Sequence, residues 1–302
     1  MISYIKALLN RLPYISTLYR ENTLLKRNSK YPPGHFYSPV ISVNELKDRE
    51  NEIWGGSGVE GIAGLSIDVK SQKNLLNEFG EYYVEIPFKK EKVQGLRYYF
   101  GNTLYTYTDG IVLYSMIRKF MPNRIIEIGS GFSSSVMLDT NELFFQNSID
   151  LTFIEPYPQR LLSLMTTRDK QNYNIVDDKV QNVDLSTFEK LNENDILFVD
   201  SSHVIKTGSD VNHIIFNILP RLNSGVLIHF HDVFFPFEYP KDWVLKGYNW
   251  NETYALKAFL MYNDCYEIIL FSDFMHKFYK NAFSELPLAY LNTGGNLWLK
   301  KK

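Results

Sequence analysis

The strongest constraint in this sequence is a regular alternation of short apolar segments with helical stretches, which begins near residue 108. Such alternation is typical of βαβ units, in which right-handed crossovers join parallel strands. It predicts an α/β fold whose sheet is covered by helices on both faces. The expected strands cover residues 124–128, 151–155, 196–200, 225–230, 266–271 and 296–299, with a weaker one around Val180.

Residues 1–98 lack this regularity and are expected to form an accessory or lid region, followed by the main domain over 99–302. The segment 31–39 contains three prolines and cannot be helical. A short helix is expected near 74–79, and another over 111–121 enters the main domain. The helix expected over 252–262 precedes the last two strands, and the link 272–295 shows no regular pattern.

The amino-terminal residues form an apolar stripe at helical spacing, made of Ile2, Ile5, Leu8, Leu9 and Leu12. Such a face docks on the main domain or on a second copy, so a homo-oligomer is one expected outcome. The stripe is too short and too interrupted for an export signal. No run of ~18 apolar residues exists, so a membrane span is not expected.

Charge and cysteine content narrow the partners. Lys and Arg total 32 against 34 Asp and Glu, a net charge of −2, which gives no electrostatic footprint for nucleic acid. The single cysteine, Cys265, excludes an internal disulfide and a multi-cysteine zinc site. A cytoplasmic location is therefore expected.

A glycine-containing segment, residues 127–134 (EIGSGFSS), follows the first expected strand directly. Gly129 and Gly131 allow a ligand to approach the backbone without meeting a Cβ. The acidic Glu127 suits a ligand that carries an ammonium group. The dinucleotide pattern requires a third glycine where this chain has Ser134, so a pyrophosphate is a poorer fit. An ordinary tight turn is the alternative reading.

Two further carboxylates stand where an adenosine could be held. Glu155 ends the second expected strand, near the ~20-residue spacing at which an acidic residue accepts the ribose hydroxyls. It could instead cap the following helix. Asp184, after the third expected strand, is a candidate for the adenine amino group or a solvated loop residue.

Histidines and aspartates gather after the fourth and fifth expected strands. Four of the six histidines lie between 203 and 231, and Asp200 and His203 follow one strand while His231 and Asp232 end the next. Neighbouring strands lie ~4.8 Å apart, so Asp200 and Asp232 should emerge side by side. Two such carboxylates repel unless a cation lies between them or one is protonated.

Together these motifs resemble the class I S-adenosylmethionine-dependent methyltransferases. Residues 199–203 with 225–232 resemble the branch that contains the macrocin and mycinamicin sugar O-methyltransferases, and residues 31–39 and 97–99 resemble uncharacterised bacterial relatives. The likeness covers about residues 102–302. It implies a Rossmann-like seven-stranded sheet, mostly parallel, with the last strand antiparallel.

The resemblance also implies roles for individual residues. The methionine part of the cofactor would contact Glu127 and the loop, and Glu155 would bind the ribose; the expected cofactor-binding residues are Glu127, Gly129, Ser130, Gly131, Ser133, Glu155 and Asp184. The histidine matching His203 is the general base in the sugar-methylating relatives. They place a divalent ion on the aspartate matching Asp200 and on an acidic pair, for which this chain has His231 and Asp232. A histidine ligand would favour Mn²⁺, Fe²⁺ or Zn²⁺ over Mg²⁺.

The expected activity is therefore O-methylation of a hydroxyl on a sugar, glycoside or related small molecule, with Asp200, His203 and Asp232 as catalytic residues. Two alternatives remain at this point. The histidine and aspartate cluster could serve a non-haem metal-dependent oxygenase. The chain could also be a catalytically silent cofactor-binding scaffold, since a fold does not fix a function.

Overall fold

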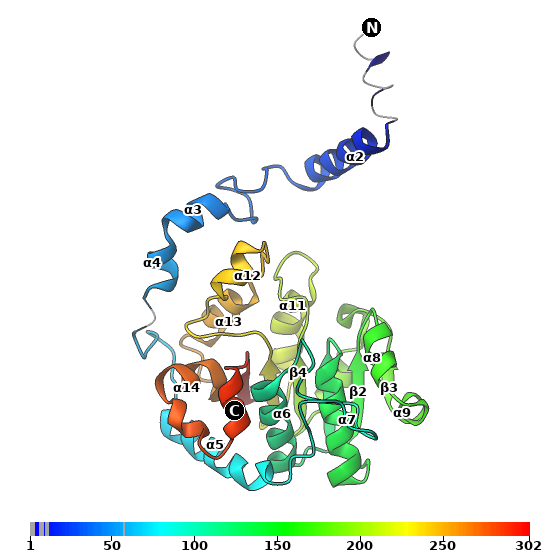
Figure 1. Cartoon of the computed structure of the whole chain (residues 1–302), viewed down its shortest axis with the longest axis vertical. Coiled ribbons are helices and arrows are strands. Elements are labelled where there is room, and N and C mark those ends of the chain that lie inside the picture. The colour runs from blue at the N-terminus through cyan, green and yellow to red at the C-terminus, as the bar shows by residue number, and fades with distance from the viewer. Residues whose placement is uncertain (1–3, 6–8, 10–11, 57) are drawn as a thin grey trace. The chain divides into compact units, whose positions relative to one another are not determined.

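The computed structural model describes every residue except 1–3, 6–8, 10–11 and 57 (Figure 1). The chain divides into two compact units, each described here by itself. The smaller comprises Met1–Gly58 with Pro240–Asn249, and the larger comprises Val59–Tyr239 with Trp250–Lys302. The chemistry-bearing motifs all belong to the larger unit.

The larger unit is built on one seven-stranded sheet with the order β3-β2-β1-β4-β5-β7-β6. β7 is antiparallel to both of its neighbours, and the other pairings are parallel. This arrangement confirms the expected fold class. The strands are β1 (Arg124–Ile128), β2 (Asp150–Ile154), β3 (Asn174–Val176), β4 (Ile196–Val199), β5 (Leu227–Phe230), β6 (Tyr266–Phe271) and β7 (Leu297–Lys301).

The strand order reverses between β1 and β4, and this reversal positions the candidate site. From β1 the chain moves outward to β2 and β3, and then returns to the other side of β1 for β4 and β5. Right-handed crossovers place the connecting helices of the two halves on opposite faces. A crevice forms at the carboxyl ends of β1 and β4, where open α/β sheets bind their ligands.

The strands form because their residues are apolar on both faces, as a sheet covered by helices requires. All four residues of β4 and all four of β5 are buried. The helices of this unit are α5 (Val69–Tyr83), α6 (Tyr107–Phe120), α7 (Phe132–Phe145), α8 (Gln159–Leu164), α9 (Thr167–Asn172), α10 (Ser186–Glu189), α11 (Asp210–His213), α13 (Glu252–Leu260) and α14 (Ser272–Phe278). A π-helical segment (Ile214–Ile218) continues α11.

Residues 59–98 contribute to the core of this same unit. Leu76 and Phe79 of α5 are fully buried, and Phe88 packs edge-on against Tyr98 at 4.8 Å between ring centroids. The compact unit therefore begins before the boundary after residue 98 that the sequence indicates. The role expected for residues 1–98 at the acceptor site stays a prediction.

Three sequence expectations differ from the structure or escape it. Val180 lies in a 3₁₀ turn (Val180–Asn182), and the third strand is the short edge strand Asn174–Val176. The link 272–295 is not irregular throughout, because it contains α14. Two residues of the amino-terminal stripe, Ile2 and Leu8, lie outside the described residues, and the other three, Ile5, Leu9 and Leu12, are exposed.

The smaller unit contains α2 (Pro13–Asn28), α3 (Val43–Asp48), α4 (Glu50–Trp54) and α12 (Lys241–Leu245). The proline-containing segment 31–39 is non-helical, as expected, and the rings of Tyr31 and His35 stack at 4.7 Å. Lys241 forms an ion pair with Glu50. Among the described residues of the whole chain, no helix combines the length and apolar character needed to cross a membrane.

Candidate active site

The glycine loop between β1 and α7 brings the ends of β1 and β4 into direct contact. Gly129 has a left-handed φ of +83°, and a Cβ at this position would lie 1.8 Å from the carbonyl oxygen of Asp200. The lack of a side chain at Gly129 therefore allows the segment that follows β4 to pack closely against the loop. At Gly131 a Cβ would meet nothing nearer than Arg160 Cδ, at 3.4 Å. Gly131 thus has room for a side chain as far as the protein is concerned.

Glu127 lies beneath this loop and ties it to α7. Its side chain is fully buried; Ser133 Oγ donates to it at 2.6 Å, and Ser134 Oγ donates to its other oxygen. Burial raises the pKa of Glu127 to about 8, although the hydroxyl donors oppose this shift. The sequence places Glu127 against a ligand's ammonium group, whereas its contacts in this structure are to the first turn of α7.

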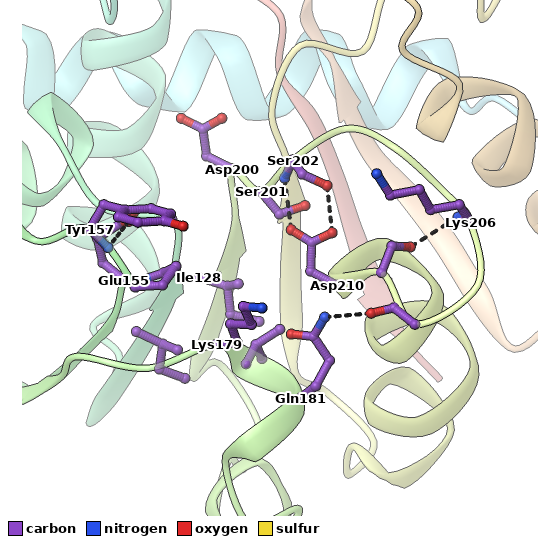
Figure 2. A pocket seen from close by; sticks show the side chains of 16 residues that line it. Ile128, Glu155, Tyr157, Lys179, Gln181, Asp200, Ser201, Ser202, Lys206 and Asp210 are labelled. Carbon is purple, nitrogen blue, oxygen red and sulfur yellow. Dashed lines mark hydrogen bonds between the residues drawn. The ribbon is translucent and has the colours of Figure 1, made fainter. Parts of the chain in front are cut away.

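Glu155 faces the crevice and is held by the backbone. One carboxylate oxygen accepts from the Ser130 N–H at 3.1 Å and the other from the Tyr157 N–H at 2.8 Å. Two cavities meet at this residue, of about 550 Å³ and about 200 Å³. Figure 2 shows the larger one. Both are also lined by Gly129, Asp200 and Ser201.

Ser130, Gly131 and Ser133 line the smaller cavity, so the loop residues expected at a cofactor do face open space. Asp184 does not. It is exposed, and the Ser186 N–H donates to its carboxylate, which lowers the pKa of Asp184. The larger cavity is lined at that end by Gln181 instead.

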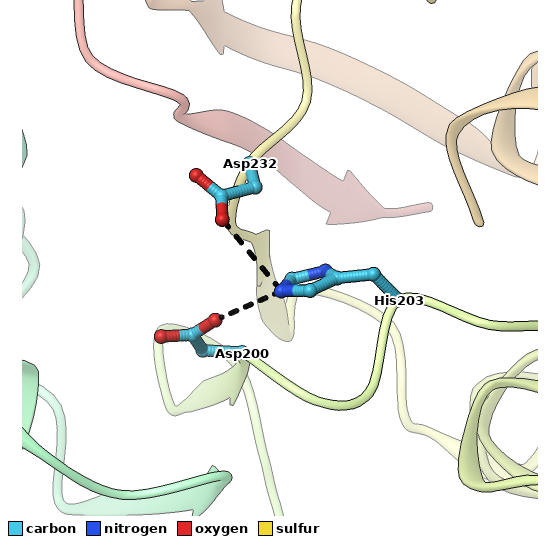
Figure 3. Close-up of side chains that lie close together, drawn as sticks. All are labelled: Asp200, His203 and Asp232. Carbon is cyan, nitrogen blue, oxygen red and sulfur yellow. Dashed lines mark ion pairs between the residues drawn. The ribbon is translucent and has the colours of Figure 1, made fainter. Parts of the chain in front are cut away.

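The ends of β4 and β5 bring three titratable side chains together (Figure 3). His203 Nε2 lies 3.4 Å from Asp200 Oδ1 and 3.7 Å from Asp232 Oδ2. The sequence predicts Asp200 and Asp232 near each other, and the structure places His203 between them. His203 is 5% exposed, whereas the side chains of Asp200 and Asp232 are 31% and 19% exposed. The imidazole is thus buried behind two carboxylates that reach the crevice.

Two of the three clustered residues have a strained backbone. His203 and Asp232 each have a left-handed φ of +57°. Glycine adopts this conformation most readily; for other residues the cost is roughly 1–2 kcal/mol, and aspartate and histidine tolerate it better than most. Non-glycine residues in this region cluster at functional sites, where the surrounding structure holds them.

A residue that sequence reasoning did not assign to the site, Glu252, lies behind His203. Its Oε2 is 2.9 Å from His203 Nδ1, and the carboxylate is buried. The backbone N–H groups of Asn251 and Glu252 donate to the His203 carbonyl at 3.0 and 3.1 Å, and the Trp250 ring lies 4.4 Å from the imidazole. No local motif links Glu252 to His203, and the only sequence signal is an acidic residue at the start of an expected helix.

Charge couples these groups. Burial alone would lower the pKa of His203, but the carboxylates of Asp200 and Glu252 outweigh it and hold that pKa well above its usual range. Burial raises the pKa of Asp232 and of Glu252. The pKa of Asp200 is lowered, because its removal from water is outweighed by His231 and His203. The surrounding carboxylates therefore favour the protonated form of His203.

The residues that could hold a metal differ in part from the expected set. Asp200, His203 and Asp232 each offer one donor atom within 4.8 Å of the others. His231, expected as a ligand, lies 3.5 Å from Asp232 through Nε2, and its ring packs on Tyr105 at 5.1 Å. The two carboxylates suit a divalent cation, which would neutralise their repulsion.

Comparison with known proteins connects this site to a family. Residues 126–233 match a family model described as a methyltransferase domain. A protein of Archaeoglobus fulgidus described as "Uncharacterized protein" is 35% identical over 168 residues, which cover 54% of this chain and 75% of the relative. The chain belongs to the same family as this archaeal protein. The segment that matches the methyltransferase model contains the glycine loop, Glu155 and the three clustered side chains.

Solved methyltransferase structures are more distant. Podospora anserina PaMTH1 with bound SAH is 17% identical, with a TM-score of 0.42, over 87% of this chain and 98% of that one. A CmcI structure with Mg and SAM is 19% identical, with a TM-score of 0.40, over 70% and 76%. TomG of Streptomyces achromogenes, an O-methyltransferase of tomaymycin synthesis, is 14% identical, with a TM-score of 0.37, over 74% and 86%. The strand order of the sheet determines the fold class on its own.

Proposed function

We propose that this protein is an S-adenosylmethionine-dependent O-methyltransferase. The observation that carries the proposal is the pair of connected cavities at the switch point of a methyltransferase domain, with Glu155 between them. Glu155 would accept the ribose hydroxyls, and Gly131 and the serines of the loop would face the methionine part. The adenine would lie toward Gln181, and Asp184 keeps only its solvated role.

The acceptor hydroxyl would lie beyond Asp200, where His203 and Asp232 meet. A hydroxyl is a poor nucleophile while protonated, and a positioned base contributes typically ~10²–10⁴-fold. His203 Nε2 would take this proton as the hydroxyl oxygen attacks the methyl carbon and the sulfonium leaves as a thioether. Asp200 and Asp232 would orient the hydroxyl in line with that carbon.

A divalent ion fits beside these carboxylates, and Asp200 and Asp232 would hold it. When bound, such an ion lowers the pKa of the acceptor hydroxyl. It would also offset the negative charge that keeps His203 protonated, and a base must be neutral to accept a proton. Mn²⁺ and Mg²⁺ are both candidates, because the two aspartates offer oxygen donors.

The acceptor we propose is a sugar, glycoside or related small molecule, on the basis of the likeness of residues 199–203 and 225–232 to sugar O-methyltransferases. Residues 1–98 would shape its site. Because 59–98 belong to the core of the larger unit, the test is removal of 1–58 alone. Cofactor affinity should persist, since the cavities are lined only by residues of the larger unit. Full turnover in that shortened chain would contradict the acceptor role.

The oxygenase alternative is less well supported by the geometry. The facial triad of non-haem iron enzymes needs two histidines and one carboxylate, whereas the donors here are one histidine and two carboxylates.

The cytoplasm is the proposed location, in keeping with the exposed free thiol of Cys265.

The decisive experiment measures S-adenosylhomocysteine binding by calorimetry, followed by methyl transfer to a glycoside panel. Gly131→Phe should abolish binding, because Gly131 lines the smaller cavity and a ring there would occupy space that the ligand needs. The protein should stay folded, because a Cβ at this position meets only the Arg160 side chain, at 3.4 Å. Asp184→Asn is the matched control and should bind normally. Equal affinity in Gly131→Phe and the unsubstituted protein would contradict the assignment, and binding without transfer to any acceptor would favour a silent scaffold.

A further inference from the structure

The carboxylate of Glu252 does not line either cavity, yet it is buried against the imidazole of His203, which lies between Asp200 and Asp232. It is 1% exposed, and burying a charged group at this depth is costly unless a partner compensates. Its partner is His203 Nδ1, at 2.9 Å. Glu252 Oε1 has no hydrogen-bond partner among the described residues. The His203 contact is thus the interaction that accounts for this carboxylate.

Glu252 holds His203 at two points. Its backbone N–H donates to the His203 carbonyl while its side chain contacts the ring. Asn251 adds a second backbone contact to the same carbonyl, and its side chain accepts from the Ile205 N–H at 2.7 Å. The start of α13 therefore fixes both the left-handed backbone of His203 and the plane of its ring.

This contact also decides which ring nitrogen faces the crevice. An ionised carboxylate only accepts hydrogen bonds, and the contact at Nδ1 is 2.9 Å against 3.4 and 3.7 Å for the carboxylates at Nε2, so the geometry favours a proton on Nδ1, donated to Glu252. In the neutral imidazole the other nitrogen, Nε2, is then the acceptor. Nε2 is the atom directed at Asp200 and Asp232 (Figure 3).

We propose that Glu252 is a positioning residue that commits His203 to the Nδ1–H tautomer, with Nε2 as the proton acceptor toward the crevice. The proposal rests on the proposed function only for the identity of the proton that Nε2 receives. After transfer of that proton the ring is an imidazolium, and Glu252 stabilises its positive charge through Nδ1. An acidic residue plays the same part in the Ser-His-Asp arrangement of hydrolases, where replacing the carboxylate by an amide costs ~10⁴-fold in kcat through the wrong tautomer.

The test uses the full chain with ¹⁵N-labelled histidine and bound S-adenosylhomocysteine. Nitrogen shifts distinguish the two neutral tautomers, and His203→Gln assigns the His203 signals. Recorded at a pH above the pKa of His203, where the ring is neutral, the unsubstituted protein should show Nδ1–H, and Glu252→Gln, whose amide can donate to Nδ1, should shift the ring toward Nε2–H. A neutral His203 found as Nε2–H in the unsubstituted protein overturns the proposal and requires no variant.

Kinetics supply the second readout. Glu252→Gln should lower kcat by ~10²–10⁴-fold with little change in KM for S-adenosylmethionine. Asp195→Asn is the matched control: Asp195 is a fully buried carboxylate that accepts from backbone N–H groups at the opposite end of β4. It should reduce stability without changing the tautomer.

An unchanged tautomer in Glu252→Gln, even with reduced stability like that of the control, overturns the proposal in favour of a structural role. The tautomer measurement does not depend on turnover. Failure to bind S-adenosylhomocysteine, or binding without methyl transfer, would count against the proposed function alone.

Discussion

Two groups of residues lie at the carboxyl ends of the strands, one on each side of Asp200, and they differ in hydrogen bonding and charge. On the glycine-loop side (residues 127–134 with Glu155), the carboxylates of Glu127 and Glu155 each receive two hydrogen bonds from the protein. On the acid–histidine side (Asp200, His203, Asp232 and Glu252), three carboxylates surround one imidazole, and two of the four residues have left-handed backbones.

The difference indicates what each side requires from a ligand. The two carboxylates of the glycine-loop side have partners within the protein, so this side can offer a preformed surface to a large ligand. The acid–histidine side carries an excess of negative charge that a proton or a cation must balance. Substitutions should therefore affect binding on the first side and turnover on the second.

The largest expected effect is on turnover. His203→Ala removes the proposed base, and kcat should fall by ~10²–10⁴-fold. Affinity for S-adenosylhomocysteine should hardly change, because the cavities are lined by other residues. Single-turnover methyl transfer and calorimetry on the same sample check both statements. Near-normal turnover would exclude His203 as the base.

The two glycines of the loop offer the next comparison, on stability. Gly129→Ala combines a left-handed backbone with a Cβ placed against the Asp200 carbonyl, and should lower the free energy of unfolding by about 3 kcal/mol or more. Gly131→Ala should change it by less than ~0.5 kcal/mol, since its Cβ has ordinary contacts only. Urea denaturation of both variants measures the difference, and equal losses would show that the contact between β1 and β4 is not rigid.

A smaller effect is expected at the ribose contact. Glu155→Gln keeps an oxygen for one backbone N–H but offers a weaker acceptor to the ribose hydroxyls. Affinity for S-adenosylhomocysteine should fall by about tenfold, in line with the ~1.5–3 kcal/mol of hydrogen bonds to charged groups. Thermal stability should stay near that of the unsubstituted protein. A tenfold loss in 5′-methylthioadenosine binding as well would localise the effect to the adenosine part.

The last prediction concerns the pH dependence of stability, to which the buried Glu127 contributes. Its folded-state pKa of about 8 lies above the ordinary 4.5. Its contribution to stability is therefore fully present below about pH 4.5 and is lost as pH rises through about 8. The unfolding free energy of the unsubstituted protein should decline across this window relative to Glu127→Gln. If bound S-adenosylhomocysteine leaves that decline unchanged, its ammonium group does not contact Glu127.

Much of the sheet could be predicted because its strands are short runs of mainly apolar residues. The runs at 124–128 and 196–200 become β1 and β4, and the carboxyl ends of parallel strands must share one edge. The proximity of Asp200 and Asp232 follows from that rule alone. The edge strand β3 has only three residues, which give a weak signal, and Val180, where the third strand was expected, lies in a turn.

What could not be predicted depends on distant packing. Glu252 reaches His203 because α13 folds back over the 203–205 loop, and no periodicity encodes this contact. Gly129 also illustrates the limit. Its presence in the motif was clear from the sequence, whereas the carbonyl that excludes a Cβ belongs to Asp200, on another strand.

The left-handed backbone of Asp232 has a consequence for how such a protein would change under selection. Glycine would relieve the backbone strain and remove a carboxylate that Asp200 repels. A laboratory screen that rewards heat resistance without assaying methyl transfer should therefore enrich Asp232→Gly. Across generations the same substitution would be removed wherever the reaction matters to the organism. An aspartate kept at position 232 despite its cost to stability would then indicate that natural selection has acted on the reaction.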